Sequence, residues 1–343
     1  MKALVYTQPY CFEYKDFADP VVGDDDVLIR VMACGICGSD VRGFTGMTGR
    51  RIPPLIMGHE AAGLVERTGK NVNGFVKGDR VCFDSTVYCN KCRACLKGSY
   101  NYCESRQVLG VSVPAFKRHG AFAEYISVPW WIVFKIPDQM SFVQSSLLEP
   151  ASIGTHAANR ARISSDSTVV VIGAGTIGLF ILQACKMKGA GRVIVADIND
   201  FRLDLANRLG ADVLINSQKT DLAGEVNRQT AGKGVDVAFE AVGFARTFLD
   251  AVSITKTGGQ LVAVGNLEKI VELNIQELVS KELTVSGSYA SSGEFARCIE
   301  LIASGKIDVE PLISEVMPLE EGPLAFDRLL KAEENLLKIV LEP

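Results

Sequence analysis

The sequence DSTVVVIGAGTIGLFILQACK, residues 166–186, carries no charge between Asp166 and Lys186 and contains three glycines. Its β-branched run at 169–172 has the length of a buried strand, and the glycines that follow mark a turn. The apolar residues after the turn are typical of a helix. Because the glycines interrupt a run that would otherwise resemble a membrane span, the stretch indicates a buried strand, a turn and a helix.

Strand-like and helical segments continue to alternate after this stretch. The strand-like segments are RVIVAD (192–197), DVLIN (212–216), VDVAFE (235–240), GQLVAVG (259–265) and ELTVSG (282–287). Phe201, Leu205 and Leu209 recur at spacings of four, as on one face of an amphipathic helix. This rhythm predicts an α/β fold with a doubly wound parallel sheet over residues 155–288.

The residues on either side of this region follow a different pattern. Five short strand-like segments near the N-terminus are KALVY (2–6), VLIRVMA (27–33), GLVERTG (63–69), DRVCF (79–83) and FAEYISV (122–128). Gly, Pro and Asp clusters separate them, which predicts an antiparallel β-rich domain with long loops. The end of the chain has two helical segments, 292–306 and 319–334, and a strand-like KIVL at 338–341.

Composition narrows the class of partner. The 343 residues are 48% hydrophobic and 22% charged, which is ordinary for a globular protein of about two domains. A net charge of −4 favours neither nucleic acid nor a membrane surface as partner. The start, MKALVYTQPY, lacks the apolar core of a signal peptide, so we expect a cytoplasmic protein that binds a small molecule. Ten cysteines in that compartment indicate metal or thiol chemistry rather than disulfides.

Four cysteines lie close together in CNKCRACLKGSYNYC, with two, two and seven residues between them. They are Cys89, Cys92, Cys95 and Cys103. This spacing predicts a structural zinc site with four thiolates and no open position. Lys91, Arg93 and Lys97 interleave the ligands and would offset the negative charge of the site. An iron–sulfur cluster and four reduced core cysteines are the alternatives.

A second group of ligand types is spread over two loops and the domain boundary. Cys37 lies in CGICGSD, His59 and Glu60 in IMGHE, and Glu149 in LLEPAS. Sulfur, nitrogen and oxygen donors together are typical of a zinc that keeps a position open for substrate. Four permanent ligands would leave no such position, so we expect Glu60 or Glu149 to exchange with water or substrate.

Three further residues are polar, and two of them have both a functional and an ordinary interpretation. Asp40 could accept the second ring N–H of His59, or be a solvated loop aspartate. We expect His119, which follows Lys117 and Arg118, in a surface loop. His156 either approaches a nicotinamide or packs at the domain junction.

The motif GxGxxG occurs where a strand gives way to a helix. It comprises Gly173, Gly175, Thr176, Ile177 and Gly178. This context predicts a dinucleotide site, with the pyrophosphate at the helix N-terminus. Asp197 ends the next strand, where an acid binds the ribose hydroxyls and repels a 2′-phosphate, so NAD is favoured over NADP. Arg202 either covers the adenine or is simply exposed.

Together these motifs give a sequence that resembles the zinc-dependent medium-chain dehydrogenases over its whole length, and most of all their polyol branch. The matching segments are CGICGSD, GHEAAG, the cysteine loop, GAFAEY, EPASIGTHA and VIGAGTIGL. The resemblance implies a catalytic zinc held by Cys37, His59 and Glu60, with Glu149 as a close or exchanging ligand, and a proton relay that begins at Ser39.

The resemblance also implies the domain organisation and the assembly. A GroES-like catalytic domain would comprise residues 1–154 and 289–343, and a Rossmann domain residues 155–288. A homodimer or homotetramer is expected, with two zinc ions per chain. The loop VRGFTGMTGRR departs from the sorbitol enzymes because it lacks their His-Tyr pattern. Its arginines, Arg42, Arg50 and Arg51, could bind a phosphorylated or acidic substrate or could simply be solvated.

The predicted function is oxidation of a secondary alcohol of a polyol, with hydride transfer to NAD. A threonine-type dehydrogenase and a cyclitol or aminocyclitol dehydrogenase are the enzymatic alternatives. A non-catalytic NAD- or zinc-binding protein is the alternative of another class, and it predicts the loss of at least one chemistry-bearing residue. The residues Cys37, Ser39, His59, Glu60 and Glu149 are all present, which also disfavours a zinc-free reductase.

Overall fold

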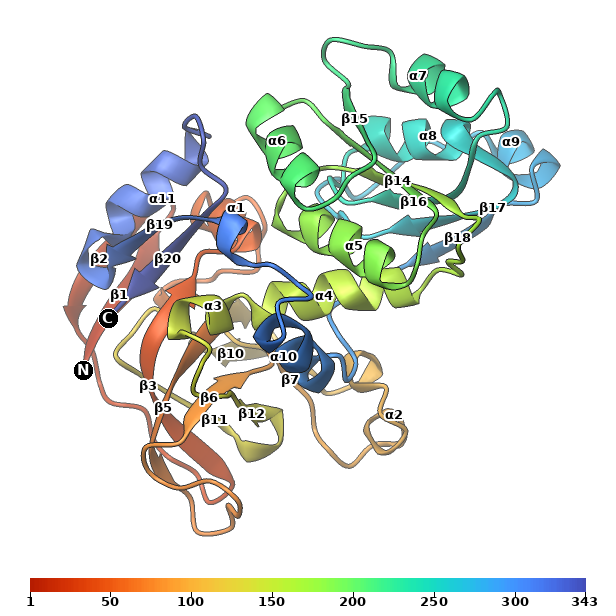
Figure 1. Ribbon diagram of the computed structural model, residues 1–343. Coiled ribbons are helices and arrows are strands. Elements are labelled where there is room, and N and C mark those ends of the chain that lie inside the picture. The colour runs from red at the N-terminus through yellow and green to blue at the C-terminus, as the bar shows by residue number, and fades with distance from the viewer. The chain divides into compact units, whose positions relative to one another are not determined.

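The computed structural model describes residues 1–343 and divides into two compact units (Figure 1). Unit 1 comprises Met1–Glu149, Ser291–Gly305 and Val309–Pro343. Unit 2 comprises Pro150–Ala290 and Lys306–Asp308. Both ends of the chain therefore belong to the same unit, and helix α4 (Leu148–Asn159) begins in unit 1 and continues into unit 2.

Unit 1 is rich in strands. These are β1 (Lys2–Gln8), β2 (Cys11–Asp16), β3 (Asp26–Gly35), β4 (Leu55–Ile56), β5 (Glu60–Thr68), β6 (Arg80–Phe83), β7 (Thr86–Val87), β8 (Gln107–Val108), β9 (Val111–Val113), β10 (Phe116–Arg118), β11 (Tyr125–Pro129), β12 (Val133–Lys135), β19 (Ile313–Pro318) and β20 (Lys338–Glu342). The largest sheet has the order β12-β6-β5-β3-β20-β19, and β11 also pairs with β3. Smaller sheets join β2-β1-β4, β9-β10 and β7-β8.

The helices of unit 1 are short. They are α1 (Gly38–Phe44), α2 (Arg93–Leu96), α3 (Phe142–Ser146), α10 (Phe295–Ala303) and α11 (Gly322–Leu330), with the 3₁₀ turns η1 (Tyr100–Tyr102), η2 (Trp130–Ile132), η3 (Glu310–Leu312) and η4 (Leu319–Glu321). Strand β3 alternates between buried and more exposed residues over Val27–Val31, as expected for a strand with one face on a core.

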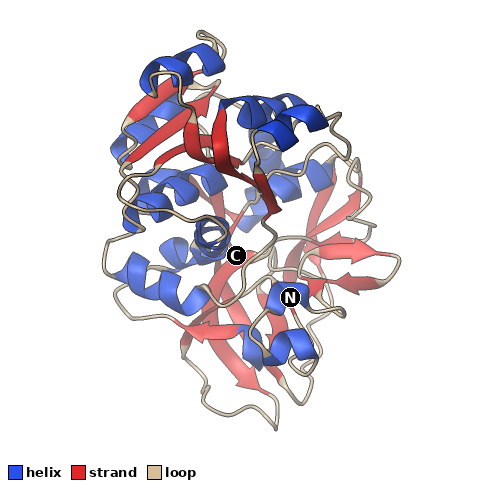
Figure 2. Ribbon diagram, turned by 90° about the vertical axis from the view of Figure 1, so that its right-hand side faces the viewer, coloured by secondary structure: helices blue, strands red, loops and turns tan.

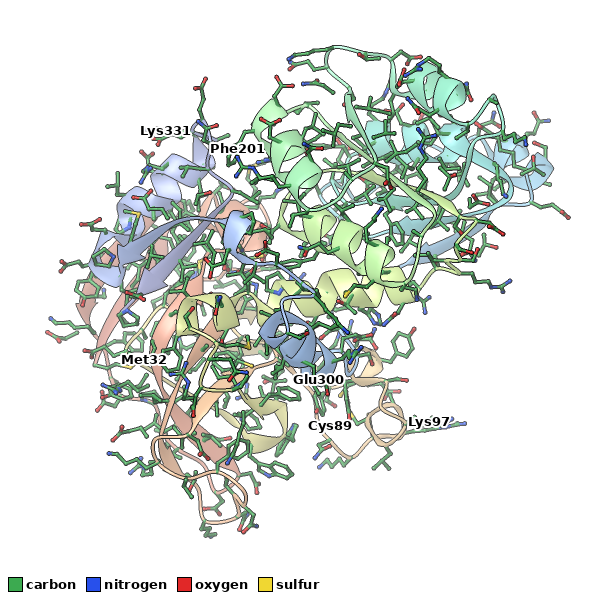
Figure 3. The ribbon with its side chains drawn as sticks, in the orientation of Figure 1. Met32, Cys89, Lys97, Phe201, Glu300 and Lys331 are labelled. Carbon is green, nitrogen blue, oxygen red and sulfur yellow. The ribbon has the colours of Figure 1, made fainter.

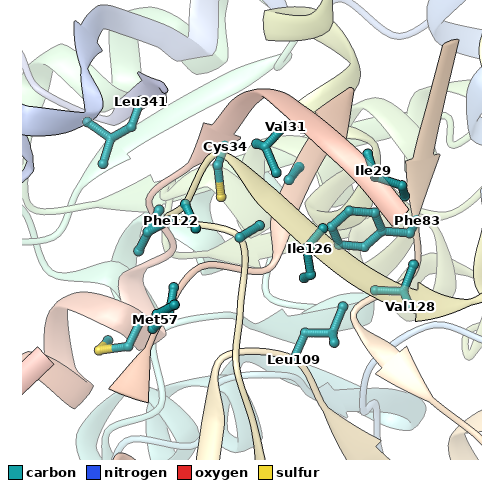
Figure 4. Packing of buried hydrophobic residues seen from close by; sticks show 14 of the residues in the cluster. Ile29, Val31, Cys34, Met57, Phe83, Leu109, Phe122, Ile126, Val128 and Leu341 are labelled. Carbon is teal, nitrogen blue, oxygen red and sulfur yellow. The ribbon is translucent and has the colours of Figure 1, made fainter. Parts of the chain in front are cut away.

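The core of unit 1 joins strands that are distant in sequence (Figure 4). Ile29 of β3, Phe83 of β6, Ile126 of β11 and Leu341 of β20 are all among its buried members. The antiparallel β-rich domain predicted from the sequence is therefore confirmed, and the C-terminal strand is part of its central sheet.

An aromatic cluster fixes helix α1. The rings of Phe12 and Phe44 are stacked with centroids 5.0 Å apart, and Phe326 of α11 lies 4.6 Å from Phe12 and 5.3 Å from Phe44. Phe44 is the last residue of α1, and Cys37 caps its N-terminus. Packing at one end of this helix thus determines where the sulfur at its other end lies.

Unit 2 contains one six-stranded sheet with helices on both sides (Figure 2). Its strands are β13 (Thr168–Ile172), β14 (Arg192–Asp197), β15 (Val213–Asn216), β16 (Val235–Glu240), β17 (Thr255–Ala263) and β18 (Thr284–Gly287). Its helices are α5 (Thr176–Met187), α6 (Asp200–Arg208), α7 (Leu222–Gln229), α8 (Ala245–Ile254) and α9 (Ile275–Ser280). All pairs are parallel in the order β15-β14-β13-β16-β17-β18, which confirms the predicted doubly wound Rossmann fold.

Several elements differ from the sequence expectation, and the six-residue strand β2 is one that was not predicted. Strand β17 begins at Thr255, four residues before the predicted segment, because an irregularity in its pairing with β16 accommodates the extra residues. Strand β19 was not predicted, since its sequence ISEVMP carries a charge and ends on a proline.

His119 lies in a loop, as expected from the sequence, but it is half-buried. Its Nδ1 accepts a hydrogen bond from the backbone N–H of Ile56 at 3.1 Å, and its ring lies edge-on to Phe17. Burial, and then the charge of Lys117, lower the pKa of His119. The imidazole is therefore neutral in the folded protein and holds the segment that leads into His59.

This contact predicts a pH-dependent contribution to stability. Because the pKa of His119 is lower when folded than when unfolded, its contribution is present above about pH 6.5 and is lost as the pH falls through the folded pKa. The amide oxygen introduced by H119Q would accept the same hydrogen bond without titrating. Between pH 7.5 and pH 5, we expect the free energy of unfolding of wild type to fall by on the order of 1 kcal/mol more than that of H119Q. Urea unfolding at the two pH values measures both. Equal losses in the two proteins would contradict this role.

Candidate metal and coenzyme sites

The pairing of β3 with β5 brings three ligand types together. In this antiparallel pair Gly35 lies opposite Glu60, so the residues just beyond each strand, Cys37 and His59, are neighbours. One donor atom from each of Cys37, His59 and Glu60 lies within 4.8 Å of the others. A thiolate, an imidazole and a carboxylate at this spacing fit a zinc ion.

Local backbone features orient two of these residues. Cys37 caps helix α1, and its Sγ accepts a hydrogen bond from the backbone N–H of Ser39 at 3.4 Å. Ser39 itself is exposed in the first turn of the helix. Gly58 has φ +89°, and a Cβ there would lie 2.7 Å from the ring of Phe122. Only glycine allows the chain to turn into His59 at this point.

Asp40 is completely buried between the side chains of Arg51 and His59. Its Oδ2 lies 3.4 Å from His59 Nδ1, and its Oδ1 accepts from Arg51 Nη2 at 3.1 Å. Burial opposes ionisation of Asp40, but His59 and Arg51 outweigh it and lower its pKa to about 2. Asp40 is thus an ionised partner for the imidazole, and the solvated alternative is wrong.

The arginines of the loop after α1 are not equivalent. Arg51 is buried against Asp40, so it is neither solvated nor available to a phosphorylated or acidic substrate, and both expectations for this residue are wrong. Its place depends on Gly43, where a Cβ would lie 2.6 Å from Arg51 Cγ. Arg50 is exposed and Arg42 partly exposed.

Lys338 is a site residue that the sequence analysis missed. Its Nζ donates to Glu60 Oε2 at 2.6 Å and to the carbonyl oxygen of Ile36 at 2.9 Å, and both charged side chains are buried. The one available signal was a lysine in an otherwise apolar strand, KIVL.

Glu149 lies at the start of α4 and is also buried. Its Oε1 accepts a hydrogen bond from Ser85 Oγ at 2.6 Å. Burial, which outweighs the attraction of His59, raises the pKa of Glu149 to about 7, and the charge of Glu60 adds to this rise. Glu149 is not within the 4.8 Å group formed by Cys37, His59 and Glu60.

The four cysteines of the loop converge. Their sulfur atoms all lie within 4.8 Å of one another, with Cys92 Sγ 3.4 Å and Cys89 Sγ 3.9 Å from Cys95 Sγ. Four sulfurs bound to one tetrahedral zinc at about 2.3 Å lie about 3.8 Å apart. Backbone N–H groups of Lys91 and Cys92 lower the pKa of Cys89 to about 6, which favours a thiolate. Lys97 points away from the loop in Figure 3.

The glycine-rich turn in unit 2 leaves room for a ligand. Gly173 has φ +101°, and a Cβ at Gly178 would lie 1.7 Å from the Gly173 carbonyl oxygen, so α5 packs closely on the turn. A Cβ at Gly175 would meet nothing within 4 Å, and no side chain caps the helix there. Thr176 and Ile177 follow in the first turn and are partly exposed. The free backbone N–H groups suit an anion such as a pyrophosphate.

Asp197 stabilises this turn. Its Oδ2 accepts from the N–H of Ala174 at 2.6 Å and its Oδ1 from that of Asn199 at 2.9 Å. A carboxylate has about four acceptor positions, so two remain for ribose hydroxyls. Arg202 is partly buried in the first turn of α6. His156 is buried in α4.

No helix of the protein has the combination of length and apolar character needed to cross a lipid bilayer.

Two family models match the chain. Residues 23–138 match the alcohol dehydrogenase GroES-like domain, and residues 176–304 match the zinc-binding dehydrogenase model. Sorbitol dehydrogenase of Bacillus subtilis is 35% identical over 100% of this chain and 97% of its own length. L-idonate 5-dehydrogenase of Vitis vinifera is 36% identical over 86% of this chain and 81% of its own.

Solved structures share the whole fold. A zinc-binding dehydrogenase from Sinorhizobium meliloti bound to NADP has a TM-score of 0.90 and 30% identity, over 100% of this chain and 99% of its own. An alcohol dehydrogenase from E. coli CFT073 in complex with NADH has a TM-score of 0.92 and 29% identity. The match covers 100% of this chain and 99% of that one. By its sequence, its fold and both family models, this chain belongs to the zinc-dependent medium-chain dehydrogenases, in the branch that contains the sorbitol dehydrogenases.

Proposed function

We propose that this enzyme oxidises a secondary alcohol of a polyol and uses NAD as the hydride acceptor. The main support is the convergence of Cys37, His59 and Glu60 within 4.8 Å, in a chain whose relatives include sorbitol and L-idonate dehydrogenases. We assign the catalytic zinc to these three residues, with Glu149 as a close or exchanging ligand, and a structural zinc to the cysteine loop.

The proposed roles follow from what each residue can do chemically. Zinc bound by such a set supplies Lewis acidity, which lowers the pKa of an alcohol hydroxyl toward neutrality. Ser39 is exposed, and we assign its hydroxyl to receive the proton and pass it toward solvent. Asp40, whose Oδ2 lies 3.4 Å from His59 Nδ1, would leave the other ring nitrogen of His59 for the metal.

The NAD preference rests on Asp197. Its buried carboxylate at the end of β14 would accept the ribose hydroxyls and repel a 2′-phosphate. The fold itself accommodates either coenzyme, since one relative of known structure is bound to NADP and another to NADH. We therefore attribute the choice to this residue and not to the fold.

A homodimer or homotetramer in the cytoplasm is also proposed. Strand β18 is an edge strand, and Val285 on it is 40% exposed, next in the chain to α9 with Ile275 and Val279 more than 60% exposed. An unpaired edge with apolar neighbours favours pairing with a second copy. All ten cysteines are free, in keeping with a reducing compartment.

The first prediction concerns the catalytic zinc. Replacing the ligand sulfur in C37S should reduce zinc from about two to about one per chain and lower kcat/KM by at least about 100-fold, because even partners of ligands cost up to that much. Zinc content and reduced-nicotinamide absorbance would be measured with polyols, sugar phosphates, cyclitols and threonine. The matched control is C11S, the same change at a cysteine outside both clusters. Unchanged zinc and turnover in C37S would refute the assignment.

The second prediction concerns the coenzyme. D197S removes the charge that would repel a 2′-phosphate, so the ratio of kcat/KM with NAD to that with NADP should fall by about 10-fold. D200S makes the same change three residues away, at an exposed carboxylate bound to Lys219, and should leave the ratio unaltered. An unchanged ratio in D197S would show that another feature selects the coenzyme.

The third prediction concerns assembly. V285K places a charge on the exposed face of the edge strand and should shift the molecular mass in light scattering toward the monomer. V21K, at a valine that is 89% exposed in unit 1, is the control and should leave the mass unaltered. A wild-type mass equal to that of one chain would exclude both the dimer and the tetramer.

A further inference from the structure

Lys338 is a charged residue in the interior of unit 1. It is 2% exposed and opens strand β20, which lies between β3 and β19 in the central sheet. The register pairs Val340 with Gly35, and the N–H of Ile36 donates to the carbonyl of Ile339 at 2.9 Å. This pairing carries Lys338 alongside the segment that leads into Cys37.

An ammonium group in such a place needs compensation. Removing a charge from water is unfavourable unless an opposite charge and hydrogen bonds replace the water. Here the replacements are Glu60 Oε2 at 2.6 Å and the carbonyl oxygen of Ile36 at 2.9 Å. Both belong to segments that carry a proposed zinc ligand.

The two contacts constrain the two segments together. Ile36 directly precedes Cys37, and Glu60 directly follows His59. One ammonium group therefore links the cysteine segment to the histidine segment from a strand that is remote in sequence. It also occupies one oxygen of Glu60 and leaves Oε1 as the oxygen free for a metal.

Glu60 and Lys338 are closely packed against Gly35. A Cβ at Gly35 would lie 2.5 Å from Glu60 Oε2 and 3.6 Å from Lys338 Cδ. The carboxylate and the lysine stem thus fill the volume above Gly35. Asp40 has its own buried cation in Arg51, so the action of Lys338 on Glu60 is separate from the contact with His59.

We propose that Lys338 is a positioning residue of the zinc site, which fixes the spacing of the two ligand segments and restricts Glu60 to a single metal-binding oxygen. The inference rests on the proposed assignment of the catalytic zinc to Cys37, His59 and Glu60.

The test compares K338M with wild type as purified zinc protein and after cobalt substitution. Loss of the ammonium should accelerate removal of the Cys37 zinc by a chelator by about 10- to 100-fold, as for other partners of metal ligands. Glu60 can then bind through both oxygens, so the visible absorption of the cobalt protein should weaken as the coordination number rises. K338R keeps the charge and should return both readouts toward wild type.

Two comparisons separate positioning from general stability. K135M removes an exposed lysine that is paired with Asp79 in the same unit, and it should retain zinc as wild type does. In an E60Q background the lysine has no carboxylate to hold, so K338M should change zinc retention by less than about threefold relative to E60Q alone. The double variant E60Q/K338M leaves no unpaired buried charge, because both members of the ion pair are replaced. Its zinc retention can therefore be measured even if K338M alone does not fold.

Three results would overturn the inference. These are wild-type zinc retention and cobalt spectrum in K338M, an equal effect of K338M with and without E60Q, or a K338R protein that behaves no better than K338M. If the proposed zinc assignment is wrong, a different result is expected. Wild type and C37S would then contain the same amount of zinc. Zinc that is lost in C37S but unaffected in K338M would contradict the role of Lys338 alone.

Discussion

The antiparallel pairing of β3 with β5 is the constraint on which the candidate zinc site depends. Gly35 faces Glu60 in this register, so Cys37 and His59 leave the two strands at the same end of the sheet. A shift of one residue would turn Glu60 to the opposite face. The strands are held in register by the apolar core between them and β6, β11 and β20. The relative positions of the candidate zinc ligands therefore depend on packing throughout the core of unit 1.

The site also contains two buried ion pairs, Asp40 with Arg51 and Glu60 with Lys338. Such pairs add little to stability when intact, but loss of one partner costs about 3–5 kcal/mol because a buried charge is left alone. In this site the two ion pairs orient the carboxylates of Asp40 and Glu60. Asp40 and Glu60 each have one oxygen bound to a cation, so the remaining oxygen of each has a defined direction. The site is ordered by the protein's own charges.

Sequence reasoning succeeded where function depends on neighbours along the chain. The strand, turn and helix at 168–187 and the spacing of Cys89, Cys92, Cys95 and Cys103 are local patterns with a direct physical meaning. It could not assign Arg51 or Lys338, because a lone basic residue is usually solvated and their partners are set by tertiary pairing. His119 lies in the predicted loop, but its contact with Ile56 could not be predicted for the same reason, since Ile56 is 63 positions away.

The position of Lys338 in the chain has a consequence for biosynthesis. Glu60 is made 278 residues before the lysine that binds it. At about 5–20 residues per second, roughly 15 to 55 seconds pass between the synthesis of Glu60 and that of Lys338, and until then the central sheet lacks β20. Zinc that meets the chain in this interval encounters Cys37, His59 and Glu60 without their lysine. The contact between Glu60 and Lys338 can therefore form only after strand β20 has been synthesised.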